Sequence, residues 1–243
     1  MPSLITFDGV VAGYGSLPVL DALTLDARAG DITLLIGPNG AGKSTVLKTF
    51  FGLLRVTAGK IGFRGRDITD ARPADLLRDG VAFVPQGRNL FPVLSVLHNL
   101  ELGATMLTRA EREERMREVL GRFPQLRERV HAQAATLSGG EQKQLEIARA
   151  LLLRPQVMLI DEPSIGLAPI VSRIVFALLR TLADAGTTVV MVEQNVRSAL
   201  AVADRVLLLE GGRLRRDSPA AGLLDDPDLN RVFLGQLAAR PPP

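Results

Sequence analysis

The sequence predicts an α/β fold with a mostly parallel sheet, and three observations carry this prediction. Short segments in which nearly every residue is apolar recur along the chain, at 32–36, 157–160 and 189–192. Helical patterns separate these segments, and strands that are apolar throughout are typical of parallel sheets covered by helices on both faces. The third observation is a glycine-rich loop, at 37–45, which follows the first of these strands and precedes a helix.

The composition allows a sizeable core and excludes several classes of protein. The 243 residues are 47% hydrophobic and 23% charged, and this length allows one large domain or two small ones. The net charge of +3 suits an anionic nucleotide or a membrane surface, but it is too small and scattered to indicate nucleic acid. The absence of cysteine excludes disulfides and thiolate metal sites. No apolar run approaches the roughly 20 residues that span a bilayer, and no signal peptide is visible. We therefore expect a protein that is soluble in the cytoplasm or peripheral to a membrane.

Before residue 87 the pattern alternates short strands with two helices. Gly-Tyr-Gly at 13–15 separates the first two strands, and a turn at 28–31 leads into the strand before the glycine-rich loop. Pro73 stands in the first turn of a short helix, where proline is favoured. The pattern predicts strands at 4–11, 19–27, 32–36, 59–65 (with a hairpin) and 81–85, and helices at 45–51 and 72–77.

From residue 95 to 154 the pattern becomes mostly helical. Thr108 and Glu111 form a capping box before a charged helix. We expect residues 87–155 to be a helical insert within a single domain, 1–236, which a disordered tail, 237–243, follows. Helices are predicted at 112–121, 138–153 and 171–185, strands at 157–160 and 189–192, and a hairpin at 205–215 with glycines 211 and 212 at its turn.

The glycine-rich loop fits the phosphate-binding pattern G-x-x-x-x-G-K-[ST], in the strand–loop–helix context that the pattern requires. Glycines let backbone N–H groups approach phosphate oxygens, and the helix N-terminus adds unpaired donors and the positive end of a dipole. The lysine provides a point charge for the β- and γ-phosphates, and the serine hydroxyl provides a ligand for Mg²⁺. A chance match is the alternative, but the flanking strand and helix favour a nucleoside triphosphate site. Its residues are Gly37, Pro38, Asn39, Gly40, Ala41, Gly42, Lys43, Ser44 and Thr45.

Two further patterns complement this loop. An apolar strand ends in Asp161 and Glu162; the first can hold Mg²⁺ directly or through water, and the second can act as general base for an attacking water. Ser138, Gly139 and Gly140 at a helix start can bind an anion by the same helix-end physics. The alternative is an N-cap serine followed by flexible glycines. One chain need not grip one nucleotide twice, whereas two copies that face each other could hold it between them.

The order of these motifs resembles that of the ATP-binding cassette (ABC) transporter ATPases. The matches span nearly the whole chain: the loop at 37–45, Gln86 after a strand, Leu-Ser-Gly-Gly-Glu-Gln at 137–142 and Leu-Ile-Asp-Glu-Pro at 159–163. The signature at 137–140 separates this family from most other phosphate-loop ATPases and kinases. The resemblance implies a phosphate-loop nucleoside triphosphatase core, an N-terminal antiparallel β subdomain and an inserted α-helical subdomain.

The resemblance also implies roles for individual residues. Two cassettes would pair head to tail, and each ATP would lie between Lys43 of one subunit and the signature of the other. Gln86 would sense Mg²⁺ and the attacking water, and its loop would contact a membrane permease. Tyr14 falls where the family stacks the adenine ring; an ordinary packed aromatic is the alternative. The Mg²⁺ ligands would be Ser44, Gln86 and Asp161, and the signature residues toward the nucleotide would be Ser138, Gly139, Gly140 and Glu141.

Two positions depart from the usual family pattern and resemble one subgroup. Most members have a switch histidine where this chain has Gln194, and most have an aspartate where this chain has Ala168. Together with Gln-Gly-Arg-Asn-Leu-Phe-Pro at 86–92, these features resemble the smaller ATPase of branched-chain amino-acid importers, with urea and short-amide importers as close relatives. We expect the catalytic residues to be Glu162, Gln86 and Gln194.

The expected function is ATP hydrolysis that powers a bacterial importer of branched-chain amino acids from the cytoplasmic face of the inner membrane. Two permease subunits and an extracytoplasmic binding protein would be other chains. The subgroup pairs two different ATPases, which implies a heterodimer, with a homodimer in isolation. Cassettes that act on nucleic acid are an alternative, but they tend to carry a long coiled coil, zinc cysteines or two cassettes, so no nucleic acid partner is expected. An exporter ATPase is a second alternative, which neighbouring genes would distinguish.

Overall fold

The computed structural model describes residues 3–87 and 89–223 of the chain, and the strands within them form two sheets. The larger sheet has six strands in the order β10-β9-β3-β8-β7-β6, and the smaller has four in the order β2-β1-β4-β5. The strands are β1 Ser3–Tyr14, β2 Leu17–Arg28, β3 Ile32–Ile36, β4 Val56–Phe63, β5 Arg66–Asp67, β6 Val81–Val84, β7 Val157–Asp161, β8 Thr188–Val192, β9 Arg205–Glu210 and β10 Arg213–Pro219.

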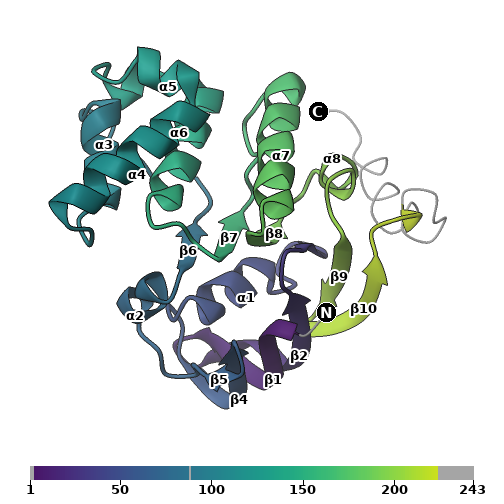
Figure 1. Ribbon diagram of the computed structural model, residues 1–243. Helices are drawn as coiled ribbons and strands as arrows, with labels where there is room; N and C mark the ends of the chain where they lie inside the picture. The colour runs from purple at the N-terminus through teal and green to yellow at the C-terminus, as the bar shows by residue number, and fades with distance from the viewer. Residues whose placement is uncertain (1–2, 88, 224–243) are drawn as a thin grey trace.

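Helices cover the larger sheet and form a separate group beside it. In Figure 1, helices α3 to α6 lie together at the upper left, away from the small sheet at the bottom. All four fall within the insert that the sequence predicts at 87–155, whereas the predicted tail at 237–243 lies outside the described residues. The helices are α1 Lys43–Phe50, α2 Pro73–Arg78, α3 Val96–Gly103, α4 Arg109–Arg122, α5 Pro124–Glu128, α6 Gly139–Leu151, α7 Pro169–Asp184 and α8 Val196–Leu200, with a 3-10 turn, η1, at Ala134–Thr136.

The larger sheet is mostly parallel, which confirms the predicted fold class. β3 pairs in parallel with β8 and β9, and β7 pairs in parallel with β6 and β8. Only the edge strand β10 joins antiparallel, to β9. Every residue of β3, β7 and β8 is buried. Strands in this position contact packed side chains on both faces, which is why their sequences are apolar throughout.

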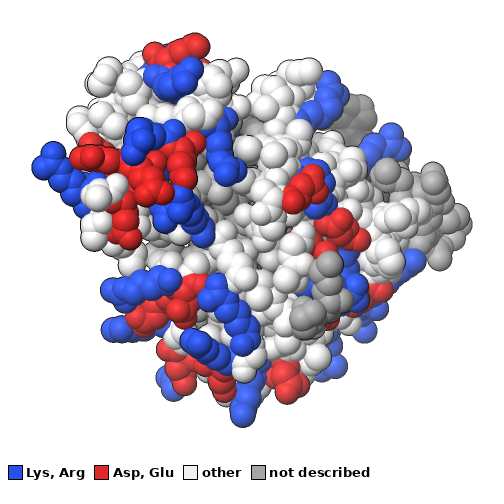
Figure 2. Space-filling view, viewed as in Figure 1, with Lys and Arg blue, Asp and Glu red and all other residues white. Residues whose placement is uncertain are grey.

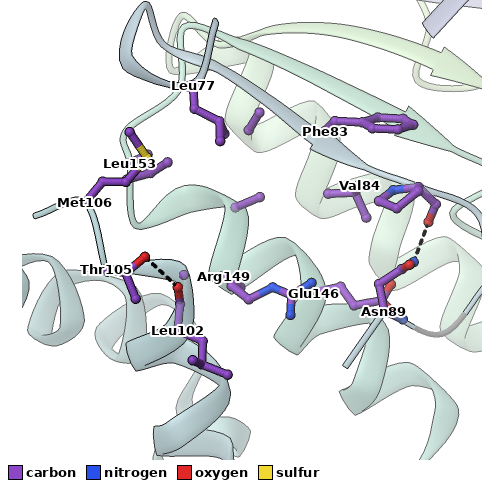
Figure 3. Close-up of a pocket in the computed structure, with 14 residues that line it drawn as sticks. Leu77, Phe83, Val84, Asn89, Leu102, Thr105, Met106, Glu146, Arg149 and Leu153 are labelled. Carbon is purple, nitrogen blue, oxygen red and sulfur yellow. Dashed lines mark hydrogen bonds between the residues drawn. The ribbon is translucent and has the colours of Figure 1, made fainter. Parts of the chain in front are cut away.

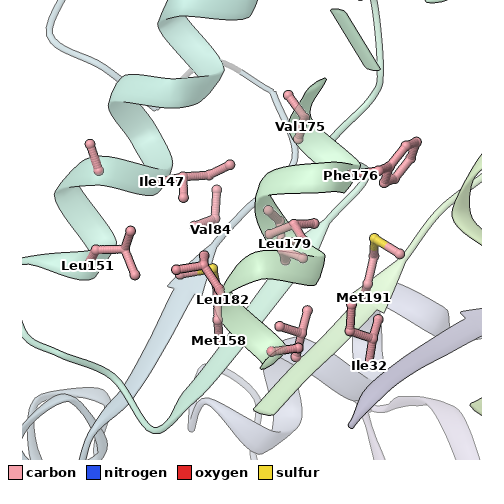
Figure 4. Packing of buried hydrophobic residues seen from close by; sticks show 14 of the residues in the cluster. Ile32, Val84, Ile147, Leu151, Met158, Val175, Phe176, Leu179, Leu182 and Met191 are labelled. Carbon is pink, nitrogen blue, oxygen red and sulfur yellow. The ribbon is translucent and has the colours of Figure 1, made fainter. Parts of the chain in front are cut away.

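The side chains of the central strands alternate between two apolar clusters. In β3, Ile32 and Leu34 belong to the cluster that α6 and α7 cover, whereas Leu35 belongs to the cluster formed with α1 and the small sheet. Figure 4 shows the first of these clusters, where α6 and α7 pack on the strands. The contributing side chains include Ile147, Leu151, Phe176, Leu179, Met158 and Met191.

The small sheet is antiparallel and forms the N-terminal part of the chain, as the family resemblance implies. Its strands are longer than predicted; β1 does not end at Val11, before the glycine at 13, but continues to Tyr14. The turn lies at Gly15, where φ is +59°. A Cβ on Gly13 would lie 2.0 Å from the carbonyl oxygen of Leu17. Glycine at 13 therefore permits the close approach of β2 rather than breaking the strand.

Several helix ends also differ from the prediction, those of α4 and α6 among them. α4 begins at Arg109, directly after its cap Thr108, although the prediction started the helix at 112. The predicted capping box is confirmed, since Thr108 and Glu111 each accept the other's backbone N–H. α6 ends at Leu151, two residues early, and Arg154 then adopts a left-handed φ of +46°.

Charged side chains of both signs are interspersed on the face shown in Figure 2. On the group of helices α3 to α6, Arg154 pairs with Glu114 at 2.8 Å and also with Glu118. Within the described part of the chain, no helix is both long enough and apolar enough to cross a membrane.

Candidate functional site

The loops that follow neighbouring parallel strands meet at one edge of the larger sheet. β3, β8 and β7 lie side by side and run in the same direction, so their carboxyl ends share an edge. Ligands of open α/β sheets bind at this edge. The fold thus brings together groups that the sequence predicts separately: the loop at 37–42 after β3, Gln86 after β6, Asp161 and Glu162 at the end of β7, and Gln194 after β8.

The phosphate loop leaves the N-terminus of α1 open. Gly42 caps this helix with φ +98° and no side-chain hydrogen bond. A Cβ on Gly37 would lie 2.2 Å from the carbonyl oxygen of Leu209, so the start of the loop can pass β9 only as glycine. Because no side chain bonds the first N–H groups of α1, they are available to an anion. The loop therefore fits the phosphates of a nucleotide.

Lys43 lies inside this loop. Its Nζ donates hydrogen bonds to the carbonyl oxygens of Gly37, at 2.8 Å, and Pro38, at 3.0 Å. Burial lowers the pKa of Lys43, while the carboxylates of Glu162 and Asp161 oppose this shift. The loop carbonyls thus hold the ammonium group in the cradle where the sequence places the β- and γ-phosphates.

Ser44 and Asp161 meet beside the loop. The Ser44 hydroxyl donates to Asp161 Oδ1 at 3.0 Å. Burial raises the pKa of Asp161, and the hydrogen bond from Ser44 opposes that rise. Within the described residues no group of three or more His, Cys, Asp or Glu side chains is arranged to hold a metal ion. The Ser44 hydroxyl and the Asp161 carboxylate alone suit Mg²⁺, because this ion is usually bound by one or two carboxylates together with substrate phosphates and not by protein groups alone.

Glu162 lies at the centre of the three predicted catalytic side chains. Its Oε2 accepts a hydrogen bond from Gln86 Nε2 at 2.7 Å, and its Oε1 accepts one from Gln194 Nε2 at 2.6 Å. The side chain is buried, and the backbone adopts φ +48°, a strained region for a residue other than glycine. Two amides therefore fix both oxygens of one buried carboxylate.

The loop that carries Gln86 is attached to the signature helix. Asn89 Nδ2 donates to the carbonyl oxygen of Pro85 at 2.9 Å, and the backbone N–H of Asn89 donates to Glu146 Oε1 of α6 at 2.8 Å. Figure 3 shows these residues beside a cavity of about 210 Å³ between β6 and the helices α3 and α6. The sequence does not single out Glu146, which pairs with Lys143 inside the protein.

Tyr14 is exposed rather than packed. Its side chain is 46% exposed, and Lys48 Nζ of α1 lies 5.6 Å from the ring centroid and 3.2 Å from the hydroxyl. The ring borders a hollow of about 630 Å³ that also contains Leu53 and Arg55. An exposed ring beside the phosphate-loop helix is available to stack on a base.

The signature turn has the N-cap geometry that the sequence offers as the plainer alternative. Ser138 Oγ accepts the N–H of Glu141 at 3.3 Å, and Glu141 Oε2 accepts the N–H of Ser138 at 2.7 Å. Ser138 and Gly139 are exposed, whereas Gly140 is buried against Val171. Among the residues that the structure describes, no hydrogen bond joins this turn to the phosphate loop of the same chain.

Glu193 belongs to the same edge of the sheet and is missing from the sequence prediction. It follows the fully buried strand β8, and its carboxylate accepts three backbone N–H groups. In the sequence, Glu193 is recognisable only as a charged residue directly after a mostly apolar strand. That pattern does not distinguish an ordinary loop residue from a carboxylate with a structural role.

A parallel sheet with an open phosphate loop, a hydroxyl–carboxylate pair beside it and a buried carboxylate held by two amides defines a phosphate-loop nucleoside triphosphatase. Within that class, the chain belongs to the ABC transporter family, whose profile matches residues 20–165.

Two curated relatives match over nearly their whole length. The chain is 39% identical to the high-affinity branched-chain amino acid transport ATP-binding protein BraG of Pseudomonas aeruginosa, across 96% of this chain and 100% of that protein. It is 37% identical to the probable branched-chain amino acid transport ATP-binding protein LivF of Archaeoglobus fulgidus, across 92% of this chain and 95% of that protein.

Solved ABC cassettes have the same fold. A cassette in its ADP conformation matches with a TM-score of 0.87 at 27% identity, covering 97% of this chain and 100% of that one. A dimeric cassette in a post-hydrolysis state, bound to ADP and phosphate, matches with a TM-score of 0.78 at 28% identity, covering 90% of this chain and 99% of that one. The chain is therefore an ATP-binding cassette ATPase.

Proposed function

We propose that this cassette hydrolyses ATP to power an importer of branched-chain amino acids. The observation that carries the hydrolytic mechanism is the Glu162 carboxylate, which Gln86 and Gln194 hold beside the Ser44–Asp161 pair. The solute follows from the full-length similarity to the two branched-chain amino acid transport proteins.

Three groups of residues would bind MgATP. The backbone of the loop at 37–45 and Lys43 would hold the phosphates, and Tyr14 would stack on the adenine. Ser44 and Asp161 would hold Mg²⁺, together with Gln86. The side-chain oxygen of Gln86, Oε1, accepts no hydrogen bond among the described residues. Bound Mg²⁺ supplies neutralisation of the charge that develops on the phosphate oxygens.

Glu162 is the general base in this proposal. Its carboxylate takes a proton from the water whose oxygen attacks the γ-phosphorus, and ADP leaves with the electron pair of the broken P–O bond. Gln86 and Gln194 donate to the two carboxylate oxygens and so orient the base. Gln194 does not titrate, so its contribution is orientation without proton transfer.

A second cassette would complete the site. Ser138, Gly139, Gly140 and Glu141 of one subunit would close on the nucleotide bound at the phosphate loop of the other. We propose a heterodimer with a second ATPase subunit, which would dock on two permease subunits at the cytoplasmic face of the membrane and receive solute from an extracytoplasmic binding protein. The dimeric cassette with ADP and phosphate supports pairing of this kind.

The first test is Glu162→Gln, which keeps the shape of the side chain but removes the basic oxygen. We expect ATP binding to persist and the rate of hydrolysis to fall by about 10²–10⁴-fold, the range of general base catalysis. Phosphate release is measured in the assembled transporter, and binding is measured by calorimetry. Hydrolysis at the wild-type rate would remove Glu162 from this role.

The second test concerns the solute. Cells or vesicles that contain the assembled transporter should accumulate labelled leucine, isoleucine or valine in an ATP-dependent manner. Labelled urea and acetamide are tested in parallel. Uptake of these amides, with no uptake of the amino acids, would contradict the proposed solute while leaving the ATPase assignment in place.

A further inference from the structure

A buried carboxylate lies next to the proposed catalytic centre without an assigned role. Glu193 is 3% exposed. Its Oε1 accepts the backbone N–H groups of Gln194, at 2.8 Å, and Asn195, at 3.1 Å. Its Oε2 accepts the backbone N–H of Ser164 at 3.1 Å. One side chain thus joins the loop after β8 to the loop after β7.

No cation among the described residues accounts for this carboxylate. Glu193 takes part in none of the ion pairs among residues 3–87 and 89–223. Burial of a charge is costly unless hydrogen bonds replace its hydration. Here three backbone donors do so, and they come from two separate loops. These hydrogen bonds therefore connect the two loops to each other, and Glu193 does not serve as one half of an ion pair with a described residue.

Glu162 is the first residue of one of the two joined loops, and Gln194 lies in the other. β7 and β8 are neighbours in register, with Asp161 opposite Val192, and the N–H of Glu162 donates to the Val192 carbonyl at 2.9 Å. Ser164 follows Glu162 by two residues, and Gln194, which follows Glu193, donates from its side chain to Glu162 Oε1. The backbone that Glu193 holds is the backbone that carries the amide of Gln194.

We propose that Glu193 is a positioning residue for hydrolysis, which fixes the Gln194 amide against Glu162 by clamping the two loops together. This inference rests on the proposed role of Glu162. A carboxylate suits the task because both of its oxygens accept hydrogen bonds, whereas a glutamine must present its NH₂ group to one of the two loops.

Glu193→Gln tests this clamp with almost no change in shape. Whichever way the new amide turns, its NH₂ group faces a backbone N–H and one loop loses its bond. We expect kcat for ATP to fall about tenfold, the effect of one hydrogen bond on a rate, while KM for ATP stays within about twofold. Glu193→Asp, which keeps two acceptor oxygens, should lie between the wild type and Glu193→Gln.

Two further readouts separate positioning from general stabilisation. In the nucleotide-free protein, amide hydrogen exchange of the peptide 163–168 should become faster in Glu193→Gln. In the double variant Glu193→Gln/Gln194→Ala, the loss of kcat should be close to that of Gln194→Ala alone, because both changes remove the same contact.

Asp204→Asn is a control at a distance from the site. The Asp204 carboxylate also accepts a backbone N–H, that of Ile32 at 2.8 Å, and it pairs with Arg180 at 2.8 Å, but at the opposite end of the sheet. This variant should lose stability and keep the wild-type kcat. A wild-type kcat in Glu193→Gln, or losses that multiply in the double variant, would overturn the clamp. Neither result would affect the outcome for Glu162→Gln, which tests the proposed function itself.

Discussion

At the scale of single residues, the site depends on amides rather than imidazoles. The two histidines of the chain, at 98 and 131, lie among α3 to α6, and Gln194 faces Glu162 where most of the family has histidine. A glutamine donates a hydrogen bond at every pH at which the protein is folded. Orientation of the base should therefore be independent of pH near neutrality.

This difference predicts the behaviour of two variants of Gln194. Gln194→Ala removes the 2.6 Å bond to Glu162 and should slow ATP hydrolysis. Gln194→His should remain active and acquire a new inflection in its pH–rate profile between about pH 5 and 8, where imidazole titrates. The measurement is kcat at saturating ATP in the assembled complex. If both variants hydrolyse ATP like the wild type at every pH, Gln194 does not act on Glu162.

Single residues also mark where sequence reasoning succeeds and where it stops. Glu162 is predictable because it ends an apolar strand, and Gln86 and Gln194 are predictable through the family resemblance; parallel strands deliver all three positions to one edge. The mutual contacts of these side chains are not predictable, since they depend on how far apart the strands lie. Glu193 escapes prediction because its partners are backbone N–H groups, which leave no trace in the residue types.

At the scale of the elements, the central strands of the larger sheet contain two buried threonines whose hydroxyl groups are bonded differently. Thr33 of β3 is fully buried in the apolar environment of Phe7 and Phe50, and its hydroxyl has no hydrogen-bond partner within residues 3–87 and 89–223. Thr188 of β8 is equally buried, but its hydroxyl accepts the N–H of Gly30 at 2.9 Å. Two buried threonines of one sheet therefore differ only in whether the hydroxyl is used.

The same substitution at Thr33 and at Thr188 should change the stability of the protein in opposite directions. Thr33→Val replaces an unpaired hydroxyl by a methyl group and should stabilise the protein by about 1 kcal/mol. Thr188→Val leaves the Gly30 N–H without its partner and should destabilise the protein by about 1–3 kcal/mol. Urea denaturation of both variants provides the measurement. A loss of stability in Thr33→Val would show that its hydroxyl is bonded in solution.

The sequence identifies the buried strands well because they need only apolar residues on both faces. It identifies strand ends less well, as β1 illustrates. By its residue type alone, Gly13 predicts the end of the strand. In the structure the strand continues through it, because the carbonyl oxygen of Leu17 in the neighbouring strand lies where a Cβ would be and only glycine fits. The end of a strand thus depends on a residue in another strand, which a local pattern does not include.

At the scale of the whole molecule, a largely buried arginine connects the two sheets. Arg205 of β9 donates to the Asp26 carboxylate of β2 at 2.8 Å and to the Asp217 carboxylate of β10 at 2.7 Å. The hydrogen bond from Arg205 is the main cause that holds the pKa of Asp26 below its ordinary value, against the opposing effect of burial. The contact therefore favours the ionised form of Asp26 in the folded protein.

This contact predicts a pH-dependent difference in stability. Because the folded-state pKa of Asp26 is lowered, its contribution is complete above the ordinary aspartate range and is lost as the pH falls through the lowered value. Asp26→Asn should cost about 1–2 kcal/mol at pH 7, after allowance for partial exposure, and progressively less below about pH 4. Urea denaturation across this range gives the difference.

Asp21→Asn is the control for this experiment. Asp21 of β2 pairs with Arg213 of β10, so it also joins the small sheet to the larger one, but its side chain is 57% exposed against 32% for Asp26. Solvent screening should make its effect on stability smaller. Equal losses in the two variants at all pH values would contradict a specific role for the Arg205 contact.

The packing of Gly140 has a consequence for motion. A Cβ at this position would lie 2.3 Å from Val171 Cγ1, so the first turns of α6 and α7 touch with nothing between them. Valine has one stiff χ1 torsion and cannot turn aside easily. The signature turn thus lies directly against the first turn of α7, into which the loop from Glu162 leads. In a dimer, a displacement of one chain's grip on the neighbour's nucleotide would be passed through this contact toward the backbone behind its own base.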